Sequence, residues 1–130
     1  MRAFWMASAL LVASLVAGCA TPAFDAAGPG ATRQTTIGKV LVDADGRTLY
    51  IYGKDEPGAS HCTGLCAMAW PPAGAGKAAE PHDGFTLVAR PDGSRQWAWQ
   101  GFPLYGYIGD NAAGDVTGEG VDGLWHAARP

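Results

Sequence analysis

The chain has 130 residues, 48% of them hydrophobic, with 9 basic and 12 acidic side chains and a formal net charge of −3. This length suits one domain and little more. The chain has no cluster of Lys and Arg, which excludes nucleic acid as an expected partner, because phosphate contacts need basic patches. No nucleophile elbow, phosphate loop or dinucleotide fingerprint occurs, so neither an enzyme nor a cofactor is expected.

Residues 1–18 have the pattern of an export signal. Arg2 gives a positive start, and the apolar stretch Ala3–Val16 is too short to span a membrane comfortably. The stretch ends in Val16-Ala17-Gly18-Cys19, and small residues before a cysteine are typical of a bacterial lipoprotein signal. An ordinary secretory signal with an incidental cysteine, or an uncleaved anchor, is the alternative.

Lipidation of Cys19 would make the membrane a partner, since each buried methylene of an acyl chain contributes roughly 0.8 kcal/mol. Ala20 stands where an aspartate would favour retention in the inner membrane. That sorting convention favours the periplasmic face of the outer membrane. Residues 19–36 are expected to form a flexible tether, because Pro and Gly interrupt them and they lack apolar periodicity.

The folded domain is expected to begin near residue 37 and to consist mainly of β-hairpins. Strands are predicted at 39–42 and 47–52, on either side of a turn that ends in Asp-Gly, and again at 85–89 and 94–100. Frequent Gly turns and little helical periodicity indicate a mainly antiparallel β fold with one or two short helices.

Side-chain alternation assigns faces to the strand at 47–52. Leu49 and Ile51 should lie on one face, with Tyr50 and Tyr52 on the other. A short helix is expected before Pro71, with Leu65, Met68 and Ala69 on a common face at spacing i, i+3, i+4.

The pattern Leu-Tyr-x-Tyr-x-x-Asp occurs twice in the chain. The two copies contain Tyr50, Tyr52 and Asp55, then Tyr105, Tyr107 and Asp110. The same offset of 55 positions also aligns Gly46 with Gly101 and Trp70 with Trp125. We therefore expect two half-repeats, at about 37–72 and 83–130, packed as one small domain about a pseudo-two-fold axis.

Two interpretations of the repeated motif are open. Stacked tyrosines beside a carboxylate could hold a sugar, a cation or the edge of a porphyrin. Alternatively, each Tyr packs across the interface between the repeats and each Asp caps amides of the loop after it. Duplication favours the second interpretation, because folding signals are duplicated more often than ligand sites.

Cys62 and Cys66 are a pair of cysteines in an exported chain, and such pairs form disulfides. At helical spacing their Cα atoms would be about 6 Å apart, within disulfide range. The alternative is handling of copper or thiol redox chemistry, with His61, Cys62, Cys66 and Met68 as a soft ligand set for Cu(I).

Together these stretches resemble a family of bacterial lipoproteins known as the secreted repeat of unknown function, which is marked by a Tyr-x-[Phe/Trp/Tyr]-x-x-Asp motif. The matching stretches are Gly46–Asp55, Cys62-x-x-x-Cys66 with Ala69–Pro72, Gly101–Asp110 and Gly118–Trp125. The resemblance runs from about residue 38 to residue 130 and implies lipoprotein export and a repeat architecture. It implies no activity, so a non-catalytic binding or envelope-structural domain is the expected function.

Overall fold

The computed structural model describes residues 29–130. The expected signal peptide (1–18), Cys19 and the first part of the tether lie outside the described residues. Over residues 29–130 the fold is mainly antiparallel β with one short α-helix, which confirms the predicted fold class. No helix in this part of the chain is long and apolar enough to cross a membrane.

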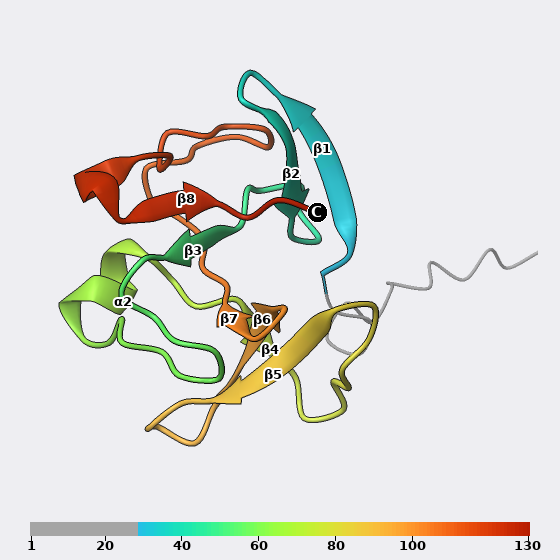
Figure 1. The fold of residues 1–130 in the computed structure, drawn as a ribbon, viewed down its shortest axis with the longest axis vertical. Helices are drawn as coiled ribbons and strands as arrows, with labels where there is room; N and C mark the ends of the chain where they lie inside the picture. The colour runs from blue at the N-terminus through green and yellow to red at the C-terminus, as the bar shows by residue number, and fades with distance from the viewer. Residues whose placement is uncertain (1–28) are drawn as a thin grey trace, which may run out of the picture.

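The described part of the chain consists of short strands and two short helices (Figure 1). The strands are β1 (Ala31–Thr35), β2 (Gly38–Val42), β3 (Tyr50–Tyr52), β4 (Gly74–Ala75), β5 (Phe85–Ala89), β6 (Arg95–Trp99), β7 (Phe102–Pro103) and β8 (Trp125–Ala127). The helices are α2 (Leu65–Ala69) and the 3-10 helix η1 (Val121–Gly123).

Two five-residue hairpin ladders occupy equivalent places in the repeats. β1 pairs with β2, and β5 pairs with β6, each in antiparallel register. β6 also pairs with β4 and β7, so the second hairpin belongs to a larger sheet. In Figure 1 the β1–β2 hairpin lies in the upper part of the domain and the β5–β6 hairpin in the lower part, with β3 and β8 on the left of the view.

The two repeats interlock in the middle of the domain rather than packing as separate units. β3 of the first repeat pairs with β8 of the second, which sets Tyr50 opposite Ala127. The equivalent bridge, 55 positions away on each side, joins Tyr105 to Pro72. Tyr50 and Tyr105 also bridge each other, with N–H···O distances of 2.7 Å and 3.0 Å. The pseudo-two-fold axis therefore passes between these two tyrosines.

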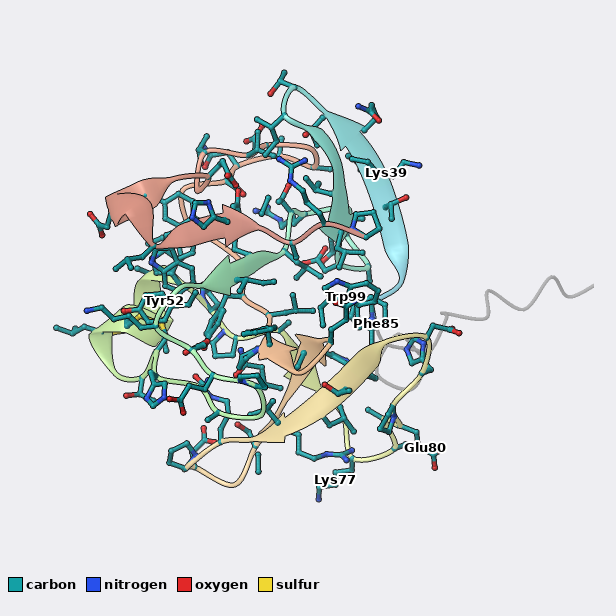
Figure 2. The ribbon with its side chains drawn as sticks, viewed as in Figure 1. Lys39, Tyr52, Lys77, Glu80, Phe85 and Trp99 are labelled. Carbon is teal, nitrogen blue, oxygen red and sulfur yellow. A yellow bond between two sulfur atoms is a disulfide. The ribbon has the colours of Figure 1, made fainter. Side chains whose placement is uncertain are left out.

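Side chains from the central strands enter two different hydrophobic cores. Tyr50 and Tyr52 contribute to the first core, and Leu49 and Ile51 to the second, as the alternation predicts. The first core is built from Val40, Val42, Tyr50, Cys62, Trp70, Tyr105, Trp125 and Ala127. The second is built from Leu41, Leu49, Ala79, Phe85, Trp97, Leu104 and Ala128. Figure 2 shows Phe85 and Trp99 beside one another at the margin of the second core, where their ring centroids are 4.8 Å apart.

One expectation from the sequence is wrong in detail. Residues 31–35, placed in the tether, form β1, so the folded part begins earlier than residue 37. Four of these five side chains are exposed, so β1 has no apolar alternation and is held by its backbone ladder to β2. The expected short helix is present as α2, in which Leu65 is 83% and Met68 is 70% exposed while Ala69 packs against the first core.

Candidate functional site

The tyrosine and the aspartate of each motif copy pair with the other copy. The Tyr50 hydroxyl donates to Asp110 Oδ2 at 2.6 Å, and the Tyr105 hydroxyl donates to Asp55 Oδ2, also at 2.6 Å. All four residues are buried. The contacts join the first repeat to the second twice, in opposite directions, as a pseudo-two-fold axis requires. We call Tyr50–Asp110 and Tyr105–Asp55 the Tyr–Asp pairs.

The second oxygen of each carboxylate caps the loop that follows it. Asp55 Oδ1 accepts a hydrogen bond from the His61 amide at 2.6 Å. Asp110 Oδ1 accepts one from the Thr117 amide at 3.0 Å and one from the Thr117 hydroxyl at 2.5 Å. Each aspartate therefore fixes both its own loop and the tyrosine of the opposite repeat.

Four aromatic rings form a continuous stack in the first core, in the order Tyr52, Trp125, Trp70, Tyr107. Successive ring centroids are 4.3, 3.8 and 4.1 Å apart, and the two indole planes are within 1° of parallel. The rings come alternately from the first and the second repeat. The indoles are buried, whereas the two tyrosines at the ends are partly exposed. We call these four residues the aromatic stack.

The Tyr–Asp pairs flank this stack edge-on. Tyr50 lies 5.4 Å from Trp70 and Tyr105 lies 5.2 Å from Trp125, centroid to centroid, with near-perpendicular planes. Such edge contacts are favourable, because the positive edge of one ring meets the negative face of another. Gly118 closes the packing: a Cβ there would lie 2.8 Å from Tyr50 ring carbons and 2.9 Å from Trp70.

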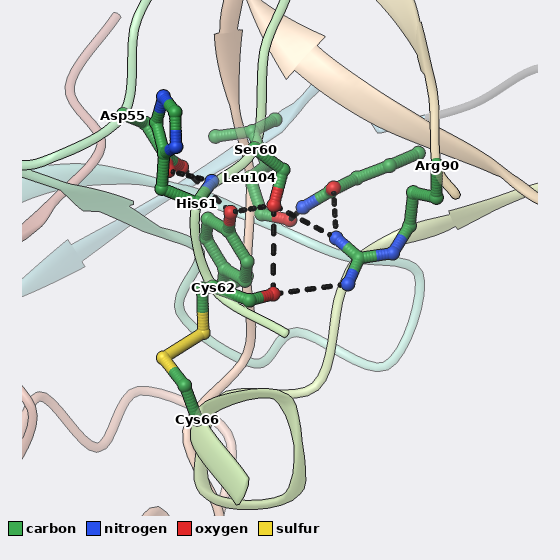
Figure 3. Close-up of a disulfide and its surroundings, with 9 residues drawn as sticks. Asp55, Ser60, His61, Cys62, Cys66, Arg90 and Leu104 are labelled. Atoms are coloured by element: carbon green, nitrogen blue, oxygen red, sulfur yellow. Dashed lines mark hydrogen bonds between the residues drawn. A yellow bond between two sulfur atoms is a disulfide. The ribbon is translucent and has the colours of Figure 1, made fainter. Parts of the chain in front are cut away.

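A hydrogen-bond network links the Tyr105 hydroxyl to the loop that precedes the disulfide (Figure 3). Ser60 Oγ lies 2.7 Å from the Tyr105 hydroxyl oxygen. Arg90 donates from Nη1 to Ser60 Oγ and Gln96 Oε1, and from Nη2 to the Cys62 carbonyl oxygen, at 2.7 to 2.9 Å. Arg90 thereby ties the second hairpin to the loop that holds the disulfide.

The environment of the Tyr–Asp pairs shifts their proton affinities. Burial raises the pKa of Tyr50 and that of Tyr105, and donation to Asp110 and Asp55 respectively raises each further. Burial also raises the pKa of Asp55 above its ordinary value, against the opposing effect of the hydrogen bonds from Tyr105 and His61.

The raised pKa values of Tyr50 and Tyr105 predict that the folded state loses stability in alkali. A tyrosine with a raised folded-state pKa stabilises the fold fully below its ordinary pKa of 10.0, and that contribution is lost as the pH rises. We expect the free energy of unfolding to fall by about 1.4 kcal/mol per pH unit for each tyrosine above that value. Urea denaturation at a series of pH values measures this, and a Tyr50→Phe/Tyr105→Phe variant should show a shallower fall. An equally steep fall in that variant would refute the assignment.

The structure confirms the predicted disulfide. Cys62 and Cys66 are joined with Cα atoms 5.2 Å apart (Figure 3). Cys62 is fully buried in the first core. Closing this short loop contributes about 2 kcal/mol in the chain-entropy model.

The alternative copper ligand set is not assembled in this oxidised form. Both cysteine sulfurs are taken up by the disulfide, and the Met68 side chain is 70% exposed. His61 Nε2 lies 3.8 Å from Glu56 Oε2 instead. Within residues 29–130, no three His, Cys, Asp or Glu side chains are placed to share a metal ion.

A cleft of about 450 Å³ opens beside the aromatic stack. Its apolar lining includes Leu49, Trp97, Tyr107 and Ile108, and its charged lining residues are Asp43, Asp45, Arg47 and Asp110. The full lining is Pro29, Asp43, Ala44, Asp45, Arg47, Leu49, Pro71, Pro72, Ala73, Gly74, Trp97, Gly106, Tyr107, Ile108 and Asp110. Sequence reasoning missed this cleft, because its walls come from segments far apart in the chain.

Ser60, Arg90 and Gln96 are also residues that sequence reasoning did not single out. Nothing in their local pattern marks them, since they meet only when the second hairpin packs on the loop before the disulfide. The stacking of Trp70 on Trp125 did have a signal, namely their shared offset of 55 positions.

A family model described as a secreted repeat of unknown function matches residues 31–74 and 86–129. These two segments cover more than half of the 130 residues. The chain belongs to this family. Comparison of this chain with the curated proteins and with the solved structures found no match.

The secreted repeat family has the period that the motif and the fold display. From residue 31 to residue 86 is 55 positions, the same as from Tyr50 to Tyr105. The first matched segment begins with β1 and the second begins within β5, the equivalent strand. The description of the family as secreted indicates export, and it names no catalytic activity.

Proposed function

We propose that this protein is an exported lipoprotein, anchored through lipid on Cys19 to the periplasmic face of the outer membrane, whose folded domain is a non-catalytic binding module. The secreted repeat family supports export. The small residues before Cys19 support lipidation, and Ala20 after it supports the outer membrane. The membrane is then a partner through the lipid, and nucleic acid is not a partner, given the acidic balance of charge.

The cleft is the observation that carries the binding role. Small-molecule sites are concave and mostly apolar, with a few polar groups that orient the ligand. The cleft has this composition: of its apolar lining residues, Leu49 and Trp97 are buried, while Ile108 is 62% exposed. A ligand seated on these side chains would remove apolar surface from water and so gain free energy.

Charged residues in the lining of the cleft restrict the charge of the ligands that it can bind. Asp43 and Asp45 contribute carboxylates, and Arg47 donates from Nη1 to the Asp110 carbonyl oxygen at 2.7 Å. One guanidinium hydrogen bond is therefore already used within the domain. The carboxylates of the lining suit an apolar ligand with a neutral or cationic polar group better than an anion.

The cleft also lies where the tether joins the domain. Pro29, the first residue that the structure describes, is one of its lining residues and is buried. Cys19 is ten positions earlier in the chain. Fully extended, such a segment spans at most about 35 Å, so an anchored domain would hold the cleft within that distance of the membrane.

Replacing Ile108 with aspartate should weaken binding of an apolar probe. The neutral solvatochromic dye Nile red is a suitable probe, because its fluorescence rises in an apolar site. Losing the Ile108 contact and adding a carboxylate should weaken its affinity by about tenfold or more. A fluorescence titration of the folded protein measures the change.

Leu65 supplies the matched control for this titration. It is 83% exposed and does not line the cleft. Leu65→Asp should leave Nile red affinity unchanged. Equal affinities in the wild type and Ile108→Asp, or a loss confined to Leu65→Asp, would contradict the cleft as the binding site.

Replacing Cys19 with serine should release the protein from the membrane. Serine offers no thiol for lipid attachment, and anchoring depends on the buried acyl chains. Fractionation of cells into membrane and soluble parts checks this, with an Ala20→Ser variant as the control that keeps the cysteine. A Cys19→Ser protein that stays in the membrane fraction would refute lipid anchoring.

A further inference from the structure

The aromatic stack and the Tyr–Asp pairs form one connected cluster, of which only Tyr107 and Asp110 also line the cleft. Each buried indole touches its partner indole on one face and the ring of a partly exposed tyrosine on the other. Each indole also meets the edge of a buried tyrosine, Tyr50 or Tyr105. An unbroken path of aromatic contacts therefore runs from either end of the stack to a buried phenol.

Indole and phenol are the side chains, besides those of sulfur, that most readily give up one electron. An oxidised phenol becomes a strong acid, so it must pass its proton to a base at the same time. A carboxylate oxygen is such a base, and Asp110 Oδ2 and Asp55 Oδ2 each lie 2.6 Å from a buried phenol oxygen. The partly exposed Tyr52 and Tyr107 have no hydrogen-bonded carboxylate among the described residues.

We propose that this core accepts single oxidising equivalents from small radical oxidants and holds them as a neutral tyrosyl radical at Tyr50 or Tyr105. The stack carries the equivalent inward from its partly exposed ends. The carboxylates of Asp110 and Asp55 take the phenolic proton and so fix the radical in the core. An exported protein meets such oxidants outside the reducing cytosol.

The step balances for the nitrogen dioxide radical as the oxidant. It takes one electron from the Tyr107–Trp70 end of the stack and becomes nitrite. One electron from Tyr50 then refills the stack, while the Tyr50 O–H bond breaks and its proton moves to Asp110 Oδ2. The products are nitrite, a neutral radical at Tyr50 and a neutral carboxylic acid at Asp110. The same account applies to Tyr105 and Asp55.

Flash-quench oxidation of the purified, lipidated protein in detergent tests this proposal. Photogenerated tris(bipyridine)ruthenium(III) serves as the one-electron oxidant, and transient absorption with electron paramagnetic resonance identifies the radical. We expect a neutral tyrosyl radical in the wild type. In Asp55→Asn/Asp110→Asn, which keeps the side-chain size but removes the base, its formation should slow by roughly 100-fold, leaving the oxidation on tryptophan. Unchanged formation in that variant would overturn the proposal.

A second measurement uses the unaltered protein and so does not depend on the variant folding. Chromium(III) oxalate broadens the resonance of radicals near the surface but not of those in the core. The proposal predicts a tyrosyl signal that the chromium complex leaves sharp, because Tyr50 and Tyr105 are fully buried. A broadened signal would place the radical on Tyr52 or Tyr107 and would overturn the proposal.

Discussion

Replacing Trp70 with alanine is expected to lower the free energy of unfolding by about 3–5 kcal/mol. The indole is 5% exposed and is stacked between Trp125 and Tyr107. Its removal leaves a cavity at the interface of the repeats and ends the edge contact with Tyr50. Because the Gly118 backbone lies against the indole and the rings of Trp125 and Tyr107 are held in the stack, the cavity cannot collapse easily.

Trp99→Ala provides the matched control for this prediction. Trp99 is the same residue type, but it is only partly buried and packs beside Phe85 in the second core. Its loss should cost about 1–2 kcal/mol. Urea denaturation followed by far-ultraviolet circular dichroism measures both variants. Equal losses of unfolding free energy in the two variants would mean that the aromatic stack stabilises the fold no more than a partly buried tryptophan does.

Replacing Asp110 with alanine should cost about 3 kcal/mol of unfolding free energy. The carboxylate is 3% exposed and accepts bonds from the Tyr50 hydroxyl and from the amide and hydroxyl of Thr117. Alanine leaves the Tyr50 hydroxyl buried without its acceptor, and burying an unpaired polar group is costly. It also frees the loop between Asp110 and Thr117.

Asp45→Ala is the control for the loss of one negative charge. Asp45 is exposed, and its carboxylate accepts no hydrogen bond within residues 29–130. Its replacement should change stability by less than about 0.5 kcal/mol. The same denaturation experiment compares the two variants. A cost for Asp110→Ala as small as that for Asp45→Ala would show that the buried carboxylate does not hold the loop and the opposite repeat.

The repeat could be predicted from the sequence because matching residues of the two copies are separated by the same number of positions. One offset aligns Tyr50 with Tyr105 and Trp70 with Trp125, and the family model finds the same period. Side-chain alternation also correctly placed Leu49 and Tyr50 on opposite faces of the strand. The Cys62–Cys66 disulfide followed from close spacing in an exported chain.

The exchange of partners between the repeats could not be predicted in the same way. Periodicity says which face of a strand a residue occupies but not which segment lies opposite. The pairing of Tyr50 with Asp110, rather than with Asp55 in its own copy, depends on β3 lying beside β8. The cleft depends on the same packing, since it combines residues from both repeats with Pro29.

β1 escaped prediction for a different reason. Its side chains are mostly polar and exposed, so no apolar alternation marks it as a strand. The backbone ladder to β2 supplies its hydrogen bonds, and that information lies in the partner strand. By contrast, the apolar spacing of Leu65, Met68 and Ala69 predicts the short helix correctly.

The two halves differ most at the place where the first has its disulfide. At the positions equivalent to Cys62 and Cys66, the second repeat has Thr117 and Val121. Asp110 holds its loop through the amide and the hydroxyl of Thr117, as Asp55 holds its own loop through the His61 amide. The first repeat adds a disulfide directly after that loop, and the second has no cysteine there.

A double-mutant cycle tests most directly whether the repeats are joined by exchanged Tyr–Asp pairs. Tyr50→Phe combined with Asp110→Ala should show a coupling energy of about 1.5–3 kcal/mol in urea denaturation, the range for a buried hydrogen bond to a charged group. Tyr50→Phe combined with Asp55→Ala, the pairing within one copy, should be additive within about 0.5 kcal/mol. Coupling between Tyr50 and Asp55, or none between Tyr50 and Asp110, would contradict the interlocked fold.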